Sequence, residues 1–254
     1  MNKISLEEAK QLQYEMLKEM HRACEQHGLR YYLAYGTLLG AIRHKGYIPW
    51  DDDIDVMMPR DDFFKLAETY RSDRYSIVSC YNDTSYEYAF GRMYDTRTAA
   101  NKGKFETKGL CIDIYLLNAW PKDEKERKRL SKEIRFFQKL RIYLIGIRNR
   151  LAVKRLWPCK TLGFPLLQWA CKKEEMLRGK YVLGASSFVQ ISTDARLYDY
   201  KDFKEAVLAQ FEDREFFIPV GYDGILKCCY GDYMQLPPVE ERHPYHGTGG
   251  CHWK

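Results

Sequence analysis

Residues 35–58 read YGTLLGAIRHKGYIPWDDDIDVMM, and this stretch decides the fold class of the chain. Its first half predicts a short helix over residues 37–44 that opens directly after Gly36. Its second half alternates acidic and apolar residues, which predicts a strand over residues 53–58 that Pro59 stops. A small-residue turn, a helix and an acidic strand therefore follow one another closely.

Two carboxylates of the acidic strand are predicted to share one site. Side chains alternate faces along a strand, so Asp53 and Asp55 project together while the apolar residues between and after them enter the core. Like charges resist joint ionisation, so this pair favours a bound cation, and carboxylate oxygens favour Mg²⁺ or Mn²⁺. Asp113, inside the apolar stretch 110–115, is the third candidate ligand. Taken alone, the run 51–53 fits a solvated loop equally well.

A phosphate site is predicted beside these acids. Gly36 and Thr37 lie where the predicted helix opens, and free N–H groups with the positive dipole end suit a phosphate. Arg43 and Lys45 add cations for charge-assisted contacts. Trp50 stands next to the acids, so we expect its ring to contact the substrate.

Two weaker candidates each carry two interpretations. Arg92 lies on a predicted strand between the two acidic strands. We favour a phosphate contact for it over an edge-strand arginine that faces water. Asp232 either contacts the donor or acceptor, or belongs only to a turn that ends a helix.

Composition describes a globular chain. Its 254 residues are 45% hydrophobic and 30% charged, with a mean hydropathy of -0.54, which excludes disorder, collagen and coiled coil. The eight cysteines form no Cys-x-x-Cys pair, and no basic segment followed by an apolar run opens the chain. We therefore expect free thiols, a reducing compartment and no membrane span.

Periodicity elsewhere predicts an α+β arrangement. A capping box at Ser5 and Glu8 begins a helix that Gly28 ends, and Asp61 is predicted to cap the helix that follows it. Helices are predicted over residues 62–70, 202–211 and 222–230, and strands over residues 29–35, 75–80, 88–94, 110–117 and 216–219. Helices that alternate with single strands, followed by clustered strands, are typical of a mixed sheet flanked by helices.

Residues 122–180 stand apart in charge. They hold 18 lysines and arginines against 6 acidic residues, a net charge of +12 in a chain whose total is +6. Helical spacing with breaks near Pro158 and Pro165 predicts a basic helical insertion in a single domain over residues 1–254. A solvated helical face is the favoured interpretation, and attachment to anionic lipid is the second. No recognised module accompanies the charge, so we expect no nucleic-acid partner.

The C-terminus gathers potential metal ligands, namely His243, His246, Cys251 and His252. Their spacing matches no standard structural zinc pattern, so we favour a mobile tail over a zinc site.

Three segments together resemble the signature of one family. Residues 35–56, the third acid at residues 112–114, and residues 230–238 are similar to the LicD family, whose members include bacterial phosphorylcholine transferases. The same domain occurs in fukutin-related protein. The resemblance covers most of the chain except the basic insertion, and it implies a nucleotidyltransferase-like α+β fold.

The resemblance also implies a reaction. A phosphorylated alcohol, phosphocholine above all, would move from a CDP-activated donor to a hydroxyl of a glycan or lipid-linked glycan, releasing CMP. Teichoic acid, capsule or lipopolysaccharide would be the acceptor, and the protein would be cytoplasmic, at the inner face of the plasma membrane. Alternatives are ribitol- or glycerol-phosphate transfer, nucleotidyl transfer from an NTP, and a non-catalytic module that binds phosphate or nucleic acid.

Particular roles follow from the same resemblance. Asp53 and Asp55 would hold Mg²⁺ against the donor diphosphate, and Asp113 would complete the metal site or accept the acceptor's proton. Gly36 and Thr37 would form the edge of the donor site on the side of the nucleotide. The family motif also has an acid at the position of Asp51, whereas Asp52 occupies a variable one and is left out of the ligand set. Twenty tyrosines and five tryptophans hint at an aromatic cage for a choline head group.

Overall fold

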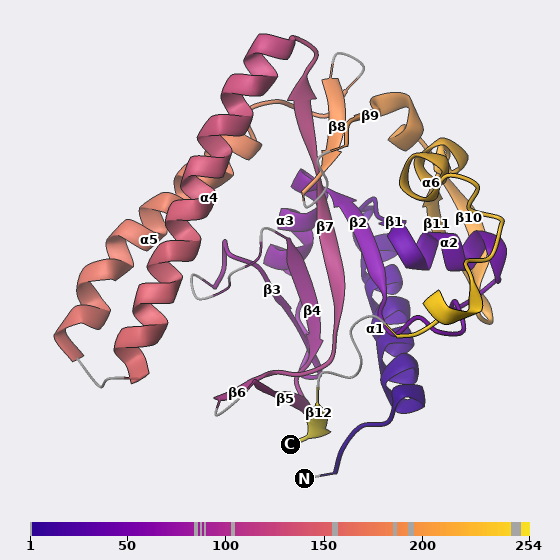
Figure 1. Cartoon of the computed structure of the whole chain (residues 1–254), viewed down its shortest axis with the longest axis horizontal. Coiled ribbons are helices and arrows are strands. Elements are labelled where there is room, and N and C mark those ends of the chain that lie inside the picture. The colour runs from indigo at the N-terminus through magenta and orange to yellow at the C-terminus, as the bar shows by residue number, and fades with distance from the viewer. Residues whose placement is uncertain are drawn as a thin grey trace. The chain divides into compact units, whose positions relative to one another are not determined.

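The computed structural model forms two compact units, and Figure 1 labels their elements. The residues that the structure describes are 2–83, 86, 88, 90–102, 105–153, 157–184, 187–192, 196–244 and 250–254, without the side chains of 101–107 and 148–164. Unit 1 comprises Met1–Ile77, Arg92–Leu116 and Lys201–Lys254, and unit 2 comprises Val78–Gly91 and Leu117–Tyr200. The expected α+β class with a mixed sheet and flanking helices is confirmed.

Helix α1 (Leu6–His27) opens unit 1 as predicted. The Ser5 hydroxyl accepts from the Glu8 backbone N–H, and the Glu8 carboxylate accepts from the Ser5 N–H, so both halves of the capping box are present. Gly28 ends the helix at a φ of 62°, a left-handed conformation that glycine adopts without strain. The capped helix buries an apolar face against the rest of unit 1.

The other helices of unit 1 are α2 (Tyr35–Arg43), α3 (Arg60–Thr69), α6 (Tyr222–Tyr230) and the short η2 (Val239–Glu241). Helix α2 begins two residues before the predicted start, so Gly36 lies in its first turn. Helix α3 follows Pro59 directly, so the prediction that Asp61 caps it is wrong. The proline ends the preceding strand and leaves no room for a separate capping residue.

Five strands of the central sheet lie in unit 1 in the order β1-β2-β7-β4-β3. They are β1 (Tyr32–Leu33), β2 (Asp55–Pro59), β3 (Tyr75–Val78), β4 (Gly91–Asp95) and β7 (Cys111–Pro121), which continues into unit 2. Strand β2 is buried along its whole length. It begins at Asp55, so the prediction that Asp53 is a strand residue is wrong. Because β2 and β7 are neighbours, Asp55 and Asp113 lie on adjacent strands.

Two smaller sheets complete unit 1. One pairs β10 (Ala206–Phe211) with β11 (Arg214–Pro219), and the other has the order β12-β5-β6, with β12 (Cys251–Trp253), β5 (Thr98–Lys102) and β6 (Phe105–Lys108). The predicted helix over residues 202–211 is wrong. Only its start is helical, as η1 (Tyr200–Phe203), and antiparallel pairing with β11 overrides the helical propensity of the remainder.

The C-terminus is a strand rather than the predicted mobile tail. Cys251 and His252 are buried in β12, which pairs with β5 in the register Cys251↔Ala100. His246 lies outside the described residues, so the zinc interpretation stays a prediction.

Unit 2 is built on the basic region. Helices α4 (Glu124–Val153) and α5 (Trp157–Arg178) form the predicted helical insertion and lie side by side (Figure 1). Strand β8 (Ser187–Ile191) pairs antiparallel with the C-terminal part of β7, and β9 (Tyr198–Asp199) pairs with β8. The predicted break at Pro165 is wrong because α5 runs through it. Leu167 and Cys171, just beyond, pack against Ile145 of α4 and hold the helix together.

The described cysteines fit the expectation of free thiols: Cys24, Cys80, Cys111, Cys171, Cys228, Cys229 and Cys251 form no disulfide among themselves. Within the described residues, no helix has the length and apolar content that a bilayer span requires.

A buried ion network fixes the hairpin of unit 2. Arg141 and Glu174 are fully buried and 2.9 Å apart, and Arg178 joins the same carboxylate at 3.0 Å. Arg141 also donates to the Tyr86 carbonyl at 3.3 Å. Two buried guanidinium groups therefore share one carboxylate, and the Arg141–Glu174 pair ties α4 to α5.

We predict that Glu174→Gln lowers the free energy of unfolding by about 3–5 kcal/mol, because it leaves buried guanidinium groups without their counter-charge. Urea denaturation measures the change. Glu124→Gln breaks the exposed Lys128–Glu124 pair and serves as the matched control, which should leave the midpoint unchanged. Equal effects of the two variants would contradict the role assigned to the buried network.

Candidate active site

The site is organised around the start of α2. Tyr35 has a φ of 42°, a strained value for a residue with a side chain, and the Ala34 N–H donates to the Asp55 carbonyl at 3.0 Å. A Cβ on Gly36 would stand 2.5 Å from Asp51 Oδ2. Only glycine therefore lets the first turn of α2 come this close to the Asp51 carboxylate.

Thr37 attaches the same turn to the acidic strand. Its buried hydroxyl accepts a hydrogen bond of 2.8 Å from the Asp55 backbone N–H. The side chain predicted to contact substrate thus sets where β2 begins, and with it the position of the Asp55 carboxylate.

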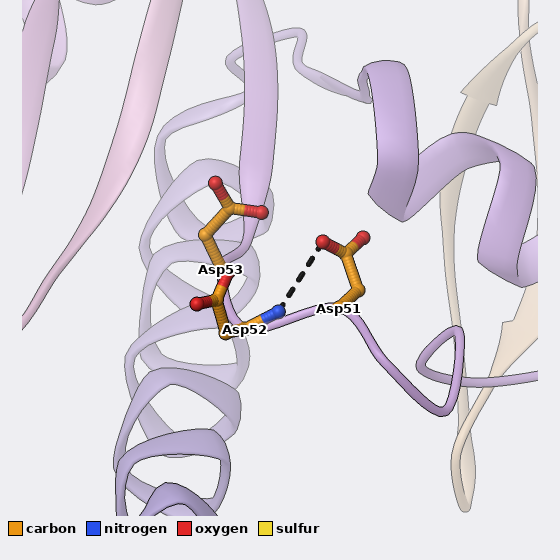
Figure 2. Close-up of side chains that lie close together, drawn as sticks. All are labelled: Asp51, Asp52 and Asp53. Carbon is orange, nitrogen blue, oxygen red and sulfur yellow. Dashed lines mark hydrogen bonds between the residues drawn. The ribbon is translucent and has the colours of Figure 1, made fainter. Parts of the chain in front are cut away.

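Three consecutive carboxylates precede β2. Ligand oxygens of Asp51, Asp52 and Asp53 lie within 4.8 Å of one another. Figure 2 shows the three side chains close together, with Asp51 to one side of Asp52 and Asp53. The Asp52 N–H donates to Asp51 Oδ1 at 3.2 Å, and the Gln13 side chain donates to the Asp52 carbonyl at 3.3 Å. These bonds fix the loop that presents Asp51 and Asp53 together.

The pKa values of Asp53 and Asp55 are both raised in this arrangement. Burial, followed by the charges of Asp51, Asp52 and Asp113, raises the pKa of Asp53 to about 7. Burial also raises the pKa of Asp55 well above its usual range, and the charges of Asp53, Asp113 and Asp51 add to the rise. The structure therefore brings the three predicted ligands into one electrostatic cluster and adds Asp51 to it.

Asp113 has a cationic partner. Arg92 Nε donates to Asp113 Oδ1 at 2.6 Å, and Arg92 Nη2 donates to Oδ2 at 3.3 Å. Both side chains keep about a fifth of their surface exposed, so the pair remains accessible. The Asp113 N–H donates to the Ile54 carbonyl at 3.0 Å, which locks the two acidic strands in register.

Tyrosine rings border the acids. Tyr35 and Tyr115 meet edge to face with centroids 5.1 Å apart, and the Tyr115 hydroxyl donates to Asp113 Oδ2 at 3.4 Å. Burial, then the charges of Asp55 and Asp113, raise the pKa of Tyr115. Burial and the neighbouring Cys229, Asp55 and Asp51 likewise raise that of Tyr230 in α6. These tyrosines are not among the site residues predicted from the sequence, although Tyr35 begins the motif that decides the fold.

Arg43 and Trp50 both contact His44 and the C-terminal segment. Arg43 Nη1 donates to the Tyr233 carbonyl at 2.7 Å and to the Gln235 carbonyl at 3.3 Å. The Trp50 ring lies 5.4 Å from the Arg242 guanidinium. Both residues hold the segment after α6 in place.

Lys45 and Asp232 are exposed. Lys45 adopts a φ of 62°, and its carbonyl accepts from the Glu212 N–H at 2.9 Å. Asp232 lies in the turn after α6, where its carbonyl accepts from the Gln235 N–H at 3.1 Å. Substrate contacts of Arg43, Lys45, Trp50 and Asp232 stay predictions.

Comparison with known proteins agrees with this geometry. Residues 28–139 match the family described as LicD/FKTN/FKRP, nucleotidyltransferase domain. The chain carries a LicD-family nucleotidyltransferase domain. The matched residues contain Gly36, all four clustered acids and Arg92.

Known relatives extend the match beyond this domain. The chain is 29% identical to the lipopolysaccharide cholinephosphotransferase LicD of Haemophilus influenzae, over 97% of each chain. It is also 28% identical over 105 residues to an uncharacterised protein of Rickettsia prowazekii, covering 41% of this chain and 33% of the relative. A Rickettsia typhi protein, also uncharacterised, is 41% identical over 49 residues, 19% of this chain and 16% of its own.

We predict that Gly36→Ala lowers the turnover of this LicD-family site by about 10²-fold, because the new Cβ displaces the Asp51 carboxylate. Circular dichroism should show an unchanged helix content. Gly224→Ala in α6 is the matched control, since a Cβ there meets nothing within 4 Å, and its turnover should equal that of the parent. A fully active Gly36→Ala protein would show that this close approach has no functional purpose.

Proposed function

We propose that this protein is a metal-dependent transferase that moves phosphocholine from CDP-choline to a hydroxyl of a lipopolysaccharide-type glycan, with release of CMP. The observation that carries the proposal is the convergence of Asp51, Asp53, Asp55 and Asp113 from two adjoining segments. The end-to-end match to a lipopolysaccharide cholinephosphotransferase supports the choice of phosphocholine as the transferred group and of a lipopolysaccharide-type acceptor.

The clustered acids suit a divalent cation, Mg²⁺ or Mn²⁺. Among the described residues, Asp55 Oδ1 is buried and has no hydrogen-bond partner, and the charges that act on Asp55 most strongly are those of other carboxylates. An oxygen in that position is stabilised by a cation, and oxygen ligands are those that Mg²⁺ prefers. Asp51, Asp53 and Asp55 would hold the ion, which neutralises charge on the donor diphosphate when bound.

With the cation bound, the transfer itself would use side chains of this chain. The acceptor hydroxyl oxygen forms a bond to the phosphorus of phosphocholine, and the bond from that phosphorus to the CMP oxygen breaks. CMP leaves with the electron pair of that bond. The Arg92 guanidinium faces the developing negative charge, and the Asp113 carboxylate accepts the proton of the hydroxyl.

Choline recognition is assigned to the tyrosine pair. A quaternary ammonium group donates no hydrogen bond, so aromatic faces are its natural partners. Tyr35 and Tyr115 offer half-buried rings that border the acids. Nearby carboxylates add a negative potential that favours a cationic head group.

The decisive experiment follows CMP release from CDP-choline by the purified protein with Mg²⁺. We expect Asp53→Asn to lower this rate by at least about 10³-fold, because a cation ligand is lost. The melting temperature without metal should not fall, since one buried like charge is removed. Asp61→Asn in the exposed first turn of α3 is the control and should keep full activity.

Two results would contradict the proposal. One is an Asp53→Asn protein that turns over as fast as the parent. The other is a failure to release CMP from CDP-choline while an NTP yields diphosphate, which would assign the site to nucleotidyl transfer.

Head-group selectivity is tested separately. We expect Tyr115→Leu to raise the KM for CDP-choline about tenfold while changing that for CDP-ethanolamine much less, because a primary ammonium can replace the lost ring contact with hydrogen bonds to carboxylates and a quaternary ammonium cannot. Tyr115→Phe keeps the ring and loses only the hydroxyl, so its KM for CDP-choline should stay near the parent value. An equal rise of the KM for both donors would contradict the role of Tyr115 in recognising the quaternary ammonium.

A further inference from the structure

Helix α4 carries an exposed stripe of mixed basic and apolar side chains. Its buried face is marked by Leu130, Ile134, Arg141 and Ile145. Opposite this face, at helical spacings of three, four and seven, lie the exposed residues Lys125, Lys132, Phe136, Lys139, Tyr143 and Ile147. The stripe holds cations and apolar groups and no carboxylate. An ordinary solvated face would instead mix both signs of charge.

The apolar members of the stripe project strongly. Phe136 is 60% exposed and Tyr143 is 66% exposed. Within the described part of the chain, Lys125, Lys132 and Lys139 form no ion pair, whereas the neighbouring Arg129 pairs with Glu133 at 3.0 Å. The ammonium groups of these lysines are therefore available to pair with an external anion.

Helix α5 continues the surface. Leu166, Trp169 and Met176 recur on one face of α5, with exposures of 46%, 44% and 58%. Trp169 packs on Phe137 with ring centroids 5.3 Å apart, and Phe137 packs on Phe136 at 5.2 Å. This chain of rings joins the apolar residues of both helices into one surface, which we call the hairpin face.

We propose that the hairpin face docks on an anionic phospholipid bilayer. Interleaved lysines and exposed aromatic or aliphatic side chains are the features of helices that lie in the membrane interface, where the apolar groups enter the headgroup boundary and the cations meet lipid phosphates. The absence of acids from the α4 stripe matches a negatively charged surface. α4 is 30 residues long, and it would lie along the surface rather than span it.

The test uses the full-length protein and sedimentation with vesicles. One vesicle is phosphatidylcholine alone, and the other is phosphatidylglycerol and phosphatidylcholine in equal parts. We expect binding only to the anionic vesicles and weaker binding at high salt. Lys132→Gln combined with Lys139→Gln should weaken this binding at least about tenfold, and Phe136→Ser combined with Tyr143→Ser should do the same.

Matched controls separate the stripe from overall charge and hydrophobicity. Lys201→Gln combined with Lys204→Gln removes two exposed lysines of unit 1, and Leu208→Ser removes an exposed apolar side chain of β10. Both controls should bind like the parent. CMP release in solution should be unchanged in every variant, so loss of vesicle binding is distinguishable from loss of the catalytic site.

Three outcomes would overturn the proposal. The first is equal binding of the protein to both vesicle types, and the second is equal weakening of vesicle binding by the stripe variants and the controls. The third is a protein that binds no vesicles but forms a dimer in light scattering, which Phe136→Ser converts to a monomer. The last would assign the hairpin face to contact between two copies of the chain.

Discussion

Mutual repulsion among buried carboxylates is the constraint on which the rest of this site depends. Asp55 is buried beside Asp53, Asp113 and Asp51, and one of its oxygens has no partner among the described residues. Folding alone gains nothing from such an arrangement, because each burial favours the protonated acid. The cluster is therefore best explained by a function that supplies positive charge from outside the chain. Arg92 offsets only part of the repulsion, since it is bonded to Asp113.

The surrounding fold is arranged to keep these acids from moving apart. The Thr37 hydroxyl holds the Asp55 backbone, Gly36 admits the Asp51 carboxylate, and the Ile54 carbonyl bonds to the Asp113 N–H. Each of these three contacts uses the backbone or a small side chain, so none of them brings a cation to the acids. Rigid neighbours of this kind hold the carboxylates close together despite their repulsion, which a bound cation would reduce.

The sequence predicted that Asp53, Asp55 and Asp113 share one site, and their charges do act on one another, but their roles as ligands stay predictions. Asp53 lies before the strand, so the alternation used to pair it with Asp55 does not apply. Loop geometry around Asp51 and Asp52 brings the carboxylates together instead, and loop conformation leaves no periodic signal in a sequence. The helix expected over residues 202–211 failed for a related reason. The residues of β10 favour a helix locally, and only the partner strand β11, visible in three dimensions, makes them extended.

Charge is segregated along the chain, with the clustered acids outside residues 122–180 and an excess of lysine and arginine within them. Residues 122–180 carry a net charge of +12, so the rest of the chain, including the acids, carries −6. An acidic catalytic unit is repelled by an anionic membrane, where lipid-linked glycans are found. In the docking that we propose, the exposed lysines of α4 would offset that repulsion. The excess of cations lies in unit 2, whereas Asp53, Asp55 and Asp113 belong to unit 1.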